Sequence, residues 1–132
     1  MNWIAKNFKW VMLVSGVLTF TMVYAALFPQ AALESNFGDT LDGPLAEIVV
    51  RNWGALIALV GVMLIYGAFN AASRQLVLAV AGLSKAVFIT LVLMQGAKYL
   101  GQPVRIALVI DTLMVLLFVG YLIAARSVPR AA

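Results

Sequence analysis

The stretch that decides the fold is NWGALIALVGVMLIYGAFNAAS, residues 52–73, which holds 22 consecutive residues without a charged side chain. As an α-helix rising roughly 1.5 Å per residue it would extend about 33 Å. That length matches the hydrocarbon core of a bilayer, which is about 30 Å thick. Residues 52–73 therefore predict a membrane-spanning helix.

Three further stretches have the same character, one before it in the chain and two after it. Residues 10–28 carry no charge, and the other two stretches are apolar apart from one Lys85 and one Asp111. We therefore predict an all-α integral membrane four-helix bundle, antiparallel and up-down-up-down, as a single transmembrane domain over 1–132. The expected spans lie near 8–28, 46–69, 76–98 and 104–124.

The connections between these spans contain helix-stop and turn residues. Asn70 to Ser73 and Gly101 to Pro103 are short links, so their flanking helices should be antiparallel neighbours. The only long connection is 29–45, in which residues 30–36 should form a short helix ended by Gly38. A cleaved signal peptide is the alternative for the first span, although 19 apolar residues are long for one.

The composition excludes several classes of protein. Of the 132 residues 64% are apolar, above the 45–50% or so of soluble domains, and nine basic residues accompany only five acidic ones. The absence of Cys and His removes disulfides, thiol chemistry and the usual haem ligands. No metal site, cofactor or catalytic residue is predicted, and an enzyme is disfavoured because no Ser–His or Cys–His pair exists.

The basic residues predict the orientation of the protein in the membrane. Because this role explains why they are there, no nucleic-acid partner is expected. One side of the bilayer would hold five of them without acids, and the other two or three, together with the acidic 29–45 loop. The positive-inside rule then places both termini in the cytoplasm and the 29–45 loop outside. The five are Lys6, Lys9, Arg74, Arg126 and Arg130.

Small residues recur at helical spacing on the second and third spans. They are Gly54, Ala58, Gly61 and Ala68 on the second, and Ala79, Gly82 and Ala86 on the third. Because lipid provides no hydrophobic drive between helices, small residues mark places where backbones approach closely. We expect these stripes at helix–helix contacts, either within the chain or in a homo-oligomer.

Three ionisable residues fall inside the predicted spans, where each costs roughly 2.5–3.5 kcal/mol on insertion scales. Lys85 lies near the midplane, and Arg51 and Asp111 lie about 7 and 10 Å below the outer surface at 1.5 Å per residue. Glu47 and Gln95 lie at the outer level of the same region. These five residues form the candidate ligand-binding cluster. Asn52, Tyr66, Ser84 and Thr90 are candidates to complete a polar interior.

Two interpretations of this cluster stay open at the level of the sequence. It either fixes the register of the helices as a buried ion-pair network, or it lines a polar cavity open to the extracytoplasmic side. Such a cavity would bind a small molecule or pass a proton. The alternative function is that of a non-enzymatic accessory subunit in a larger membrane complex.

A resemblance to a family rests on three segments: RNWGALIALVG at 51–61, LSKAVF at 83–88 and VIDTLM at 109–114. With these, the chain resembles small bacterial four-helix membrane proteins of the DoxX-like kind. The resemblance covers the second to fourth helices. It implies a four-helix fold in the bacterial inner membrane, and it implies no activity and no catalytic residue.

Overall fold

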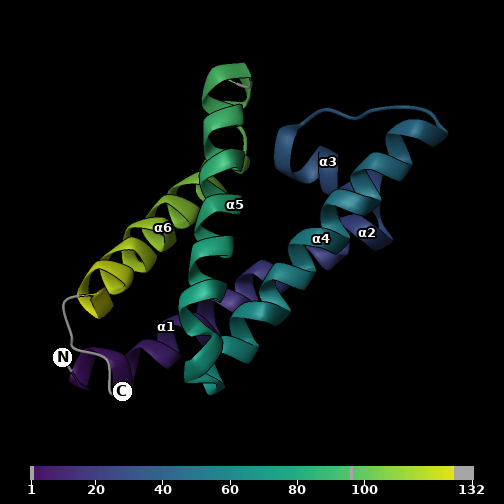
Figure 1. The fold of residues 1–132 in the computed structure, drawn as a ribbon. Coiled ribbons are helices and arrows are strands. Elements are labelled where there is room, and N and C mark those ends of the chain that lie inside the picture. The colour runs from purple at the N-terminus through teal and green to yellow at the C-terminus, as the bar shows by residue number, and fades with distance from the viewer. Residues whose placement is uncertain (1, 96, 127–132) are drawn as a thin grey trace.

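The computed structural model describes residues 2–95 and 97–126, and within these ranges the chain is helical and contains no strand. Figure 1 shows the order of the elements. They are α1 (Asn2–Phe20), α2 (Val23–Leu27), α3 (Pro29–Phe37), α4 (Pro44–Phe69), η1 (Ala71–Ser73), α5 (Arg74–Gln95), η2 (Ala97–Gly101) and α6 (Val104–Arg126).

Four segments of the described chain are long and apolar enough to cross a membrane: Asn7–Leu27, Pro44–Phe69, Ala71–Gln95 and Val104–Ala125. They agree with the predicted spans to within a few residues. The prediction of an all-α, multi-pass membrane protein with four spanning helices is therefore confirmed. Arg130, which contributed to the predicted orientation, lies outside the described residues.

The helices form two pairs that meet at one end and diverge at the other. α1 and α2 run along α4, and α5 runs along α6. In Figure 1, α4 and α5 converge at the η1 turn and separate toward the end that carries α3 and the α5–α6 connection. The molecule is thus a wedge with a closed end at η1 and an open end at α3.

The hydrophobic core fills the closed end of the wedge. Its fully buried side chains include Met12 of α1, Leu64 of α4, Leu78 of α5 and Phe118 of α6, one from each spanning helix. Phe8 of α1 packs edge-on against Phe118 and stacks on Tyr121 at 4.4 Å between ring centroids. These contacts hold the two pairs together at the closed end.

The α1–α4 contact depends on glycines. A Cβ placed on Gly61 would lie 2.5 Å from the Phe20 backbone nitrogen and 2.7 Å from the Gly16 carbonyl oxygen. Gly54 faces the α2 backbone in the same way, with the Ala26 nitrogen 2.6 Å from such a Cβ. The predicted small-residue stripe on α4 is buried throughout, so its interpretation as a helix–helix contact within the chain is confirmed.

On α5 the predicted stripe of small residues needs a correction. Gly82 is buried, but Ala79 is exposed and Ala86 is only half-buried. The inward face instead follows Val77, Ala81 and Lys85. Since each residue turns a helix by about 100°, Ala79 and Ala81 differ by about 200° and cannot share a face.

The first span is interrupted at Thr21 and Met22, between α1 and α2. The Thr21 hydroxyl donates to the Leu18 carbonyl, and the Met22 amide donates to the Thr19 carbonyl at 3.1 Å. Both bonds span three residues, so the backbone tightens here and the helix bends. The chain then continues into α3, which ends at Gly38 with φ of 68°, as the predicted 30–36 helix required.

Arg74 secures the α4–α5 link at the closed end. The side chain is buried, and it donates to the carbonyls of Gly67 at 3.2 Å and Ala68 at 2.9 Å. Asn70 accepts a bond from the Ala72 amide inside the same link. The two Arg74 bonds satisfy two of the four carbonyls that the C-terminus of α4 leaves free.

Candidate functional site

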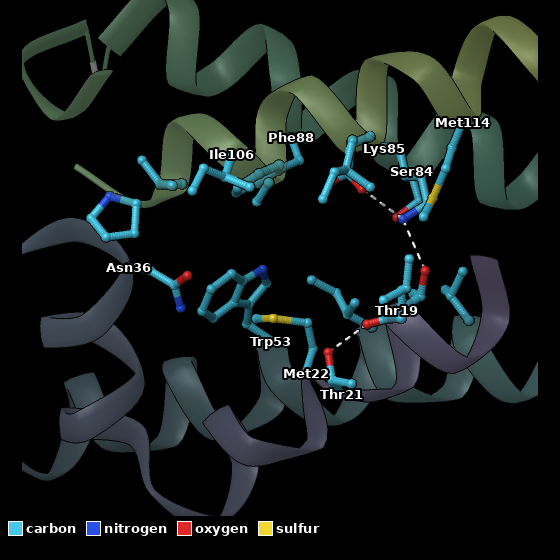
Figure 2. Close-up of a pocket in the computed structure, with 18 of the residues that line it drawn as sticks. Thr19, Thr21, Met22, Asn36, Trp53, Ser84, Lys85, Phe88, Ile106 and Met114 are labelled. Atoms are coloured by element: carbon cyan, nitrogen blue, oxygen red, sulfur yellow. Dashed lines mark hydrogen bonds and ion pairs between the residues drawn. The ribbon is translucent and has the colours of Figure 1, made fainter. Parts of the chain in front are cut away.

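A cavity of about 400 Å³ lies between the two helix pairs, on the open side of the wedge. Residues of α1, α3, α4, α5 and α6 line it, together with Thr21 and Met22 of the bend (Figure 2). The walls are mainly apolar and include Leu18, Ile57, Val60, Ile106 and Ile110. The polar and charged lining residues are Thr19, Thr21, Asn36, Ser84, Lys85 and Asp111.

An ion pair forms the polar end of the cavity. The Lys85 Nζ lies 3.0 Å from the Asp111 Oδ1 and 3.0 Å from the Thr19 Oγ1 (Figure 2). The two charged side chains are 8% and 19% exposed. The Lys85 ammonium thus joins α5 to α6 and to α1. It lies halfway along α5, which spans Arg74–Gln95, and so near the middle of the apolar span Ala71–Gln95.

The helical repeat explains why these three side chains point inward. On α5, Lys85 follows the buried Val77 and Ala81 at intervals of four residues. On α6, Asp111 lies three residues from the buried Leu108 and from Met114. Residues three and four apart share a helix face, so both charges extend an apolar stripe into the space between the helix pairs.

Two aromatic rings stand on the cavity wall farther from the ion pair. Trp53 of α4 and Phe88 of α5 lie 6.4 Å apart between ring centroids, with 27° between their planes. They come from opposite helix pairs, so they bridge the wedge. Figure 2 shows Trp53 between Asn36 on one side and Thr19 on the other.

The outer end of the cavity lies beneath α3. Asn36 and Phe37 of α3 line it, and the Phe37 ring packs edge-on against Tyr99 of η2 at 5.3 Å. The Tyr99 hydroxyl donates to the Asp39 Oδ2 at 3.0 Å. These two contacts connect the chain after α2 to the α5–α6 corner, across the open end of the wedge.

The structure brings together two of the five residues of the candidate cluster, Lys85 and Asp111. Arg51 is exposed and donates to the Ala26 carbonyl at 2.8 Å, where it has no ion pair with Asp111. Glu47 is half-buried and Gln95 is exposed, and neither lines the cavity. The distance of a residue along its helix predicts its depth in the membrane but not the side of the helix on which it lies. Arg51, Glu47 and Gln95 lie at the expected positions along their helices, but on sides that do not face Lys85 and Asp111.

The same distinction applies to the four polar candidates. All four are exposed, but Ser84 lines the cavity, whereas Asn52, Tyr66 and Thr90 do not. Thr90 donates to the Ala86 carbonyl of its own helix at 2.8 Å. Asn70 donates to the Tyr66 hydroxyl in the same part of the chain. Tyr66 and Thr90 therefore have local hydrogen-bond partners, and none of the three residues Asn52, Tyr66 and Thr90 lines the cavity.

Sequence reasoning did not find Thr19, Trp53 or Phe88 as site residues. Thr19 had a usable signal, because it continues the buried positions Phe8, Met12 and Ser15 of α1 at helical spacing. A single hydroxyl at that spacing is an ordinary feature of membrane helices, so the pattern gave no reason to choose it. The bend at Thr21 and Met22, two residues that line the cavity, had no sequence signature such as proline.

Within residues 2–95 and 97–126, no group of three or more metal-ligating side chains gathers. The charged part of the cavity is therefore an ammonium, a carboxylate and a hydroxyl, which can donate and accept hydrogen bonds in a largely apolar space. We compared the chain with known proteins, and no family model, no curated protein and no solved structure matches it.

Proposed function

We propose that this protein binds a small, mostly apolar molecule within the membrane, in the cavity between the two helix pairs. The observation that carries the proposal is a cavity of about 400 Å³ with apolar walls and a charge-neutral polar end at Lys85 and Asp111. Ligand pockets commonly have volumes of roughly 300–1,000 Å³, mainly apolar linings and a few placed polar groups. The DoxX-like resemblance supports a bacterial inner membrane as the location, and the distribution of the basic residues supports cytoplasmic termini.

The position of the ion pair favours ligand binding over a purely structural role in which the pair only holds the helices together. A pair with only that role would serve best where the helices already touch, at the closed end, and there the core consists of apolar side chains such as Leu64 and Phe118. The charged pair instead lines the cavity. Lysine and aspartate are energetically unfavourable inside a membrane, and where they occur there they are commonly functional.

The packing beyond the pair favours binding over passage of protons or solutes. A path across the membrane needs hydrogen-bonding groups or water throughout its length. In the described chain, the region between the pair and the closed end holds the fully buried Met12, Leu78 and Phe118. The cavity is therefore a pocket with one polar end, and in this state it has no continuation to the other side.

Fluorescence of Trp53 provides a direct test, because this ring lines the cavity and the chain has only three tryptophans. In a Trp3→Phe/Trp10→Phe variant in nanodiscs, we expect a bromine-labelled decane or decanol to quench Trp53 saturably. Ala107→Phe should reduce this quenching at least fivefold, because Ala107 lines the cavity and a ring there fills it.

The matched control is Val109→Phe, which places the same ring on the lipid-facing side of α6, where Val109 is 65% exposed. The proposal would be refuted if quenching by both probes rose without saturation, because this would show that the probes only partition into lipid. Equal quenching in the Ala107→Phe and Val109→Phe proteins would refute it for the same reason. An accessory subunit, the alternative function, would instead be purified together with a partner protein.

A further inference from the structure

Resting on the proposed function, we propose that the ligand is an uncharged apolar alcohol. Its hydroxyl group would lie between the Lys85 ammonium and the Asp111 carboxylate, and its hydrocarbon part would extend toward α3. The proposal rests on the hydrogen-bonding capacity that the polar end of the cavity leaves unused, on its charge, and on the position of the apolar wall.

Lys85 has one hydrogen-bond donor more than it has partners. An ammonium carries three N–H groups, and the structure gives this one two acceptors, the Asp111 Oδ1 and the Thr19 Oγ1. No other described residue accepts from it. The residue is 7% exposed and lines the cavity, so the third N–H is available to a group inside the cavity. A ligand therefore gains most by presenting an oxygen acceptor here.

Asp111 has hydrogen-bond acceptor positions that no described residue uses. An ionised carboxylate offers about four acceptor positions on two oxygens, and only its Oδ1 has a partner among the described residues. Asp111 also lines the cavity. A group that accepts from Lys85 and donates to Asp111 satisfies both, and a hydroxyl is the smallest group that does so. A ketone or an ether only accepts, and it leaves the carboxylate unsatisfied.

The charge of the site excludes ionic ligands. Among the described residues, Lys85 and Asp111 are the only ionisable groups that line the cavity, and their charges cancel. A carboxylate or an ammonium ligand would therefore bring one unpaired charge close to the middle of the bilayer, at high desolvation cost. An uncharged ligand avoids this cost.

The shape of the cavity sets the direction of the ligand. Beyond the ion pair, the wall continues through Ile110, Phe88 and Trp53 to Phe37 below α3. A hydrocarbon chain or ring system leaving the hydroxyl in this direction covers apolar wall along its whole length. Its far end then lies near Trp53, and this placement makes the tryptophan a reporter for a label on that end.

The experiment uses the same single-tryptophan protein in nanodiscs with four decyl probes, each brominated at the far end. The probes are an alcohol, its methyl ether, the parent alkane and the carboxylate. Saturation of Trp53 quenching gives the affinity of each, expressed per probe dissolved in lipid. We expect the alcohol to bind at least tenfold more tightly than the alkane, a difference of about 1.4 kcal/mol or more, because its hydroxyl hydrogen-bonds to both charged groups. The ether should fall between the two, and the carboxylate should bind weakest.

A Lys85→Met/Asp111→Leu variant removes both hydrogen-bonding groups while leaving the site neutral, and in it the alcohol and the alkane should bind equally. An alcohol no tighter than the alkane or the ether in the parent protein would overturn the inference. So would a carboxylate that binds best. In each of these cases saturable, Ala107→Phe-sensitive quenching would still support the proposed function. Loss of saturation for every probe would refute the proposed function itself. The parent protein alone decides between these outcomes, so the inference stays testable if the double variant fails to fold.

Discussion

At position 85 a lysine occupies a place in the helical repeat of α5 that Val77 and Ala81 occupy on the two preceding turns. Its stem lies among apolar neighbours, and its ammonium reaches two oxygens that come from α1 and α6. Removal of either charge would leave the other buried and unpaired, which is far less favourable than the absence of both. The pair is therefore a unit whose members have to be changed together.

Asp111→Asn should lower the stability of the protein by roughly 3 kcal/mol, at the lower end of the range for breaking a buried ion pair because Asp111 is 19% exposed. The double variant Asp111→Asn/Lys85→Met should recover most of this loss, and Asp111→Asn/Arg51→Met should recover none, since Arg51 bonds to the Ala26 carbonyl. Unfolding by SDS titration in mixed micelles measures each difference. A single variant as stable as the parent would show that the pair contributes nothing to the fold.

At the scale of the elements, the positions of the four spans in the sequence were predictable, and the distances between the helices in space were not. Length without charge determines where a helix crosses the bilayer, so the four spans follow from residues such as 52–73 directly. The stripe at Gly54 and Gly61 likewise predicts a close contact, because small residues allow two helix backbones to approach. How far α4 and α5 separate beyond η1 depends on side chains from all four spanning helices. The residue pattern of a single helix therefore cannot predict this separation.

The candidate site shows the same division. Lys85 and Asp111 stand out in the sequence because charges in spans are rare. Arg51 stands out equally, and yet it faces away from the cavity because the inward side of α4 near it belongs to Trp53 and Ile57. The apolar members of the site, which form most of its wall, resemble every lipid-facing residue in composition and become visible only in three dimensions.

The glycine contact between α1 and α4 allows a prediction with an internal control. Gly61→Ala should destabilise the protein by about 2 kcal/mol, because the new Cβ would lie 2.5 Å from the Phe20 backbone nitrogen and has to push two backbones apart. Gly120→Ala on α6, where a Cβ meets nothing within 4 Å, should instead stabilise the helix slightly. Thermal unfolding of the two variants side by side tests the difference, and equal effects would mean that α1 and α4 are not in close contact.

The link at the closed end gives a second prediction for the elements. Arg74→Met should cost about 2 kcal/mol, because the buried carbonyls of Gly67 and Ala68 lose their side-chain donors at the end of α4. Arg74→Lys keeps the charge but cannot serve both carbonyls with a planar donor group, so it should fall between the parent and the methionine variant. Chemical denaturation of the three proteins checks the order. An Arg74→Met protein as stable as the parent would contradict this role.

At the scale of the whole molecule, the wedge has to be oriented in the membrane, and the basic residues predict how. Four spans bring both ends of the chain to the same side, and the excess of lysine and arginine on that side predicts the cytoplasm. The mouth of the cavity, beneath α3, would then face the extracytoplasmic half of the bilayer. A ligand would enter from that side.

Alkaline phosphatase fusions test this orientation, because the enzyme is active only outside the cytoplasm. A fusion after Arg130 should be inactive, and a fusion within residues 36–42 should be active, because the α3 segment is then extracytoplasmic. A cytoplasmic reporter such as green fluorescent protein should give the opposite pattern at the same two sites. Activity of the phosphatase at both sites, or only after Arg130, would overturn the predicted threading.

The pairing of Lys85 with Asp111 has an electrical consequence. A membrane potential does about 2.3 kcal/mol of work per 100 mV on each elementary charge that crosses the bilayer. The two opposite charges lie 3.0 Å apart and belong to helices that pack together, so the pair itself carries no net charge through the field when α5 and α6 shift jointly. Ligand uptake should therefore proceed equally well in energised and de-energised membranes. Neutralising Asp111 alone would leave one gating charge near the midplane and would make movements of α5 respond to voltage.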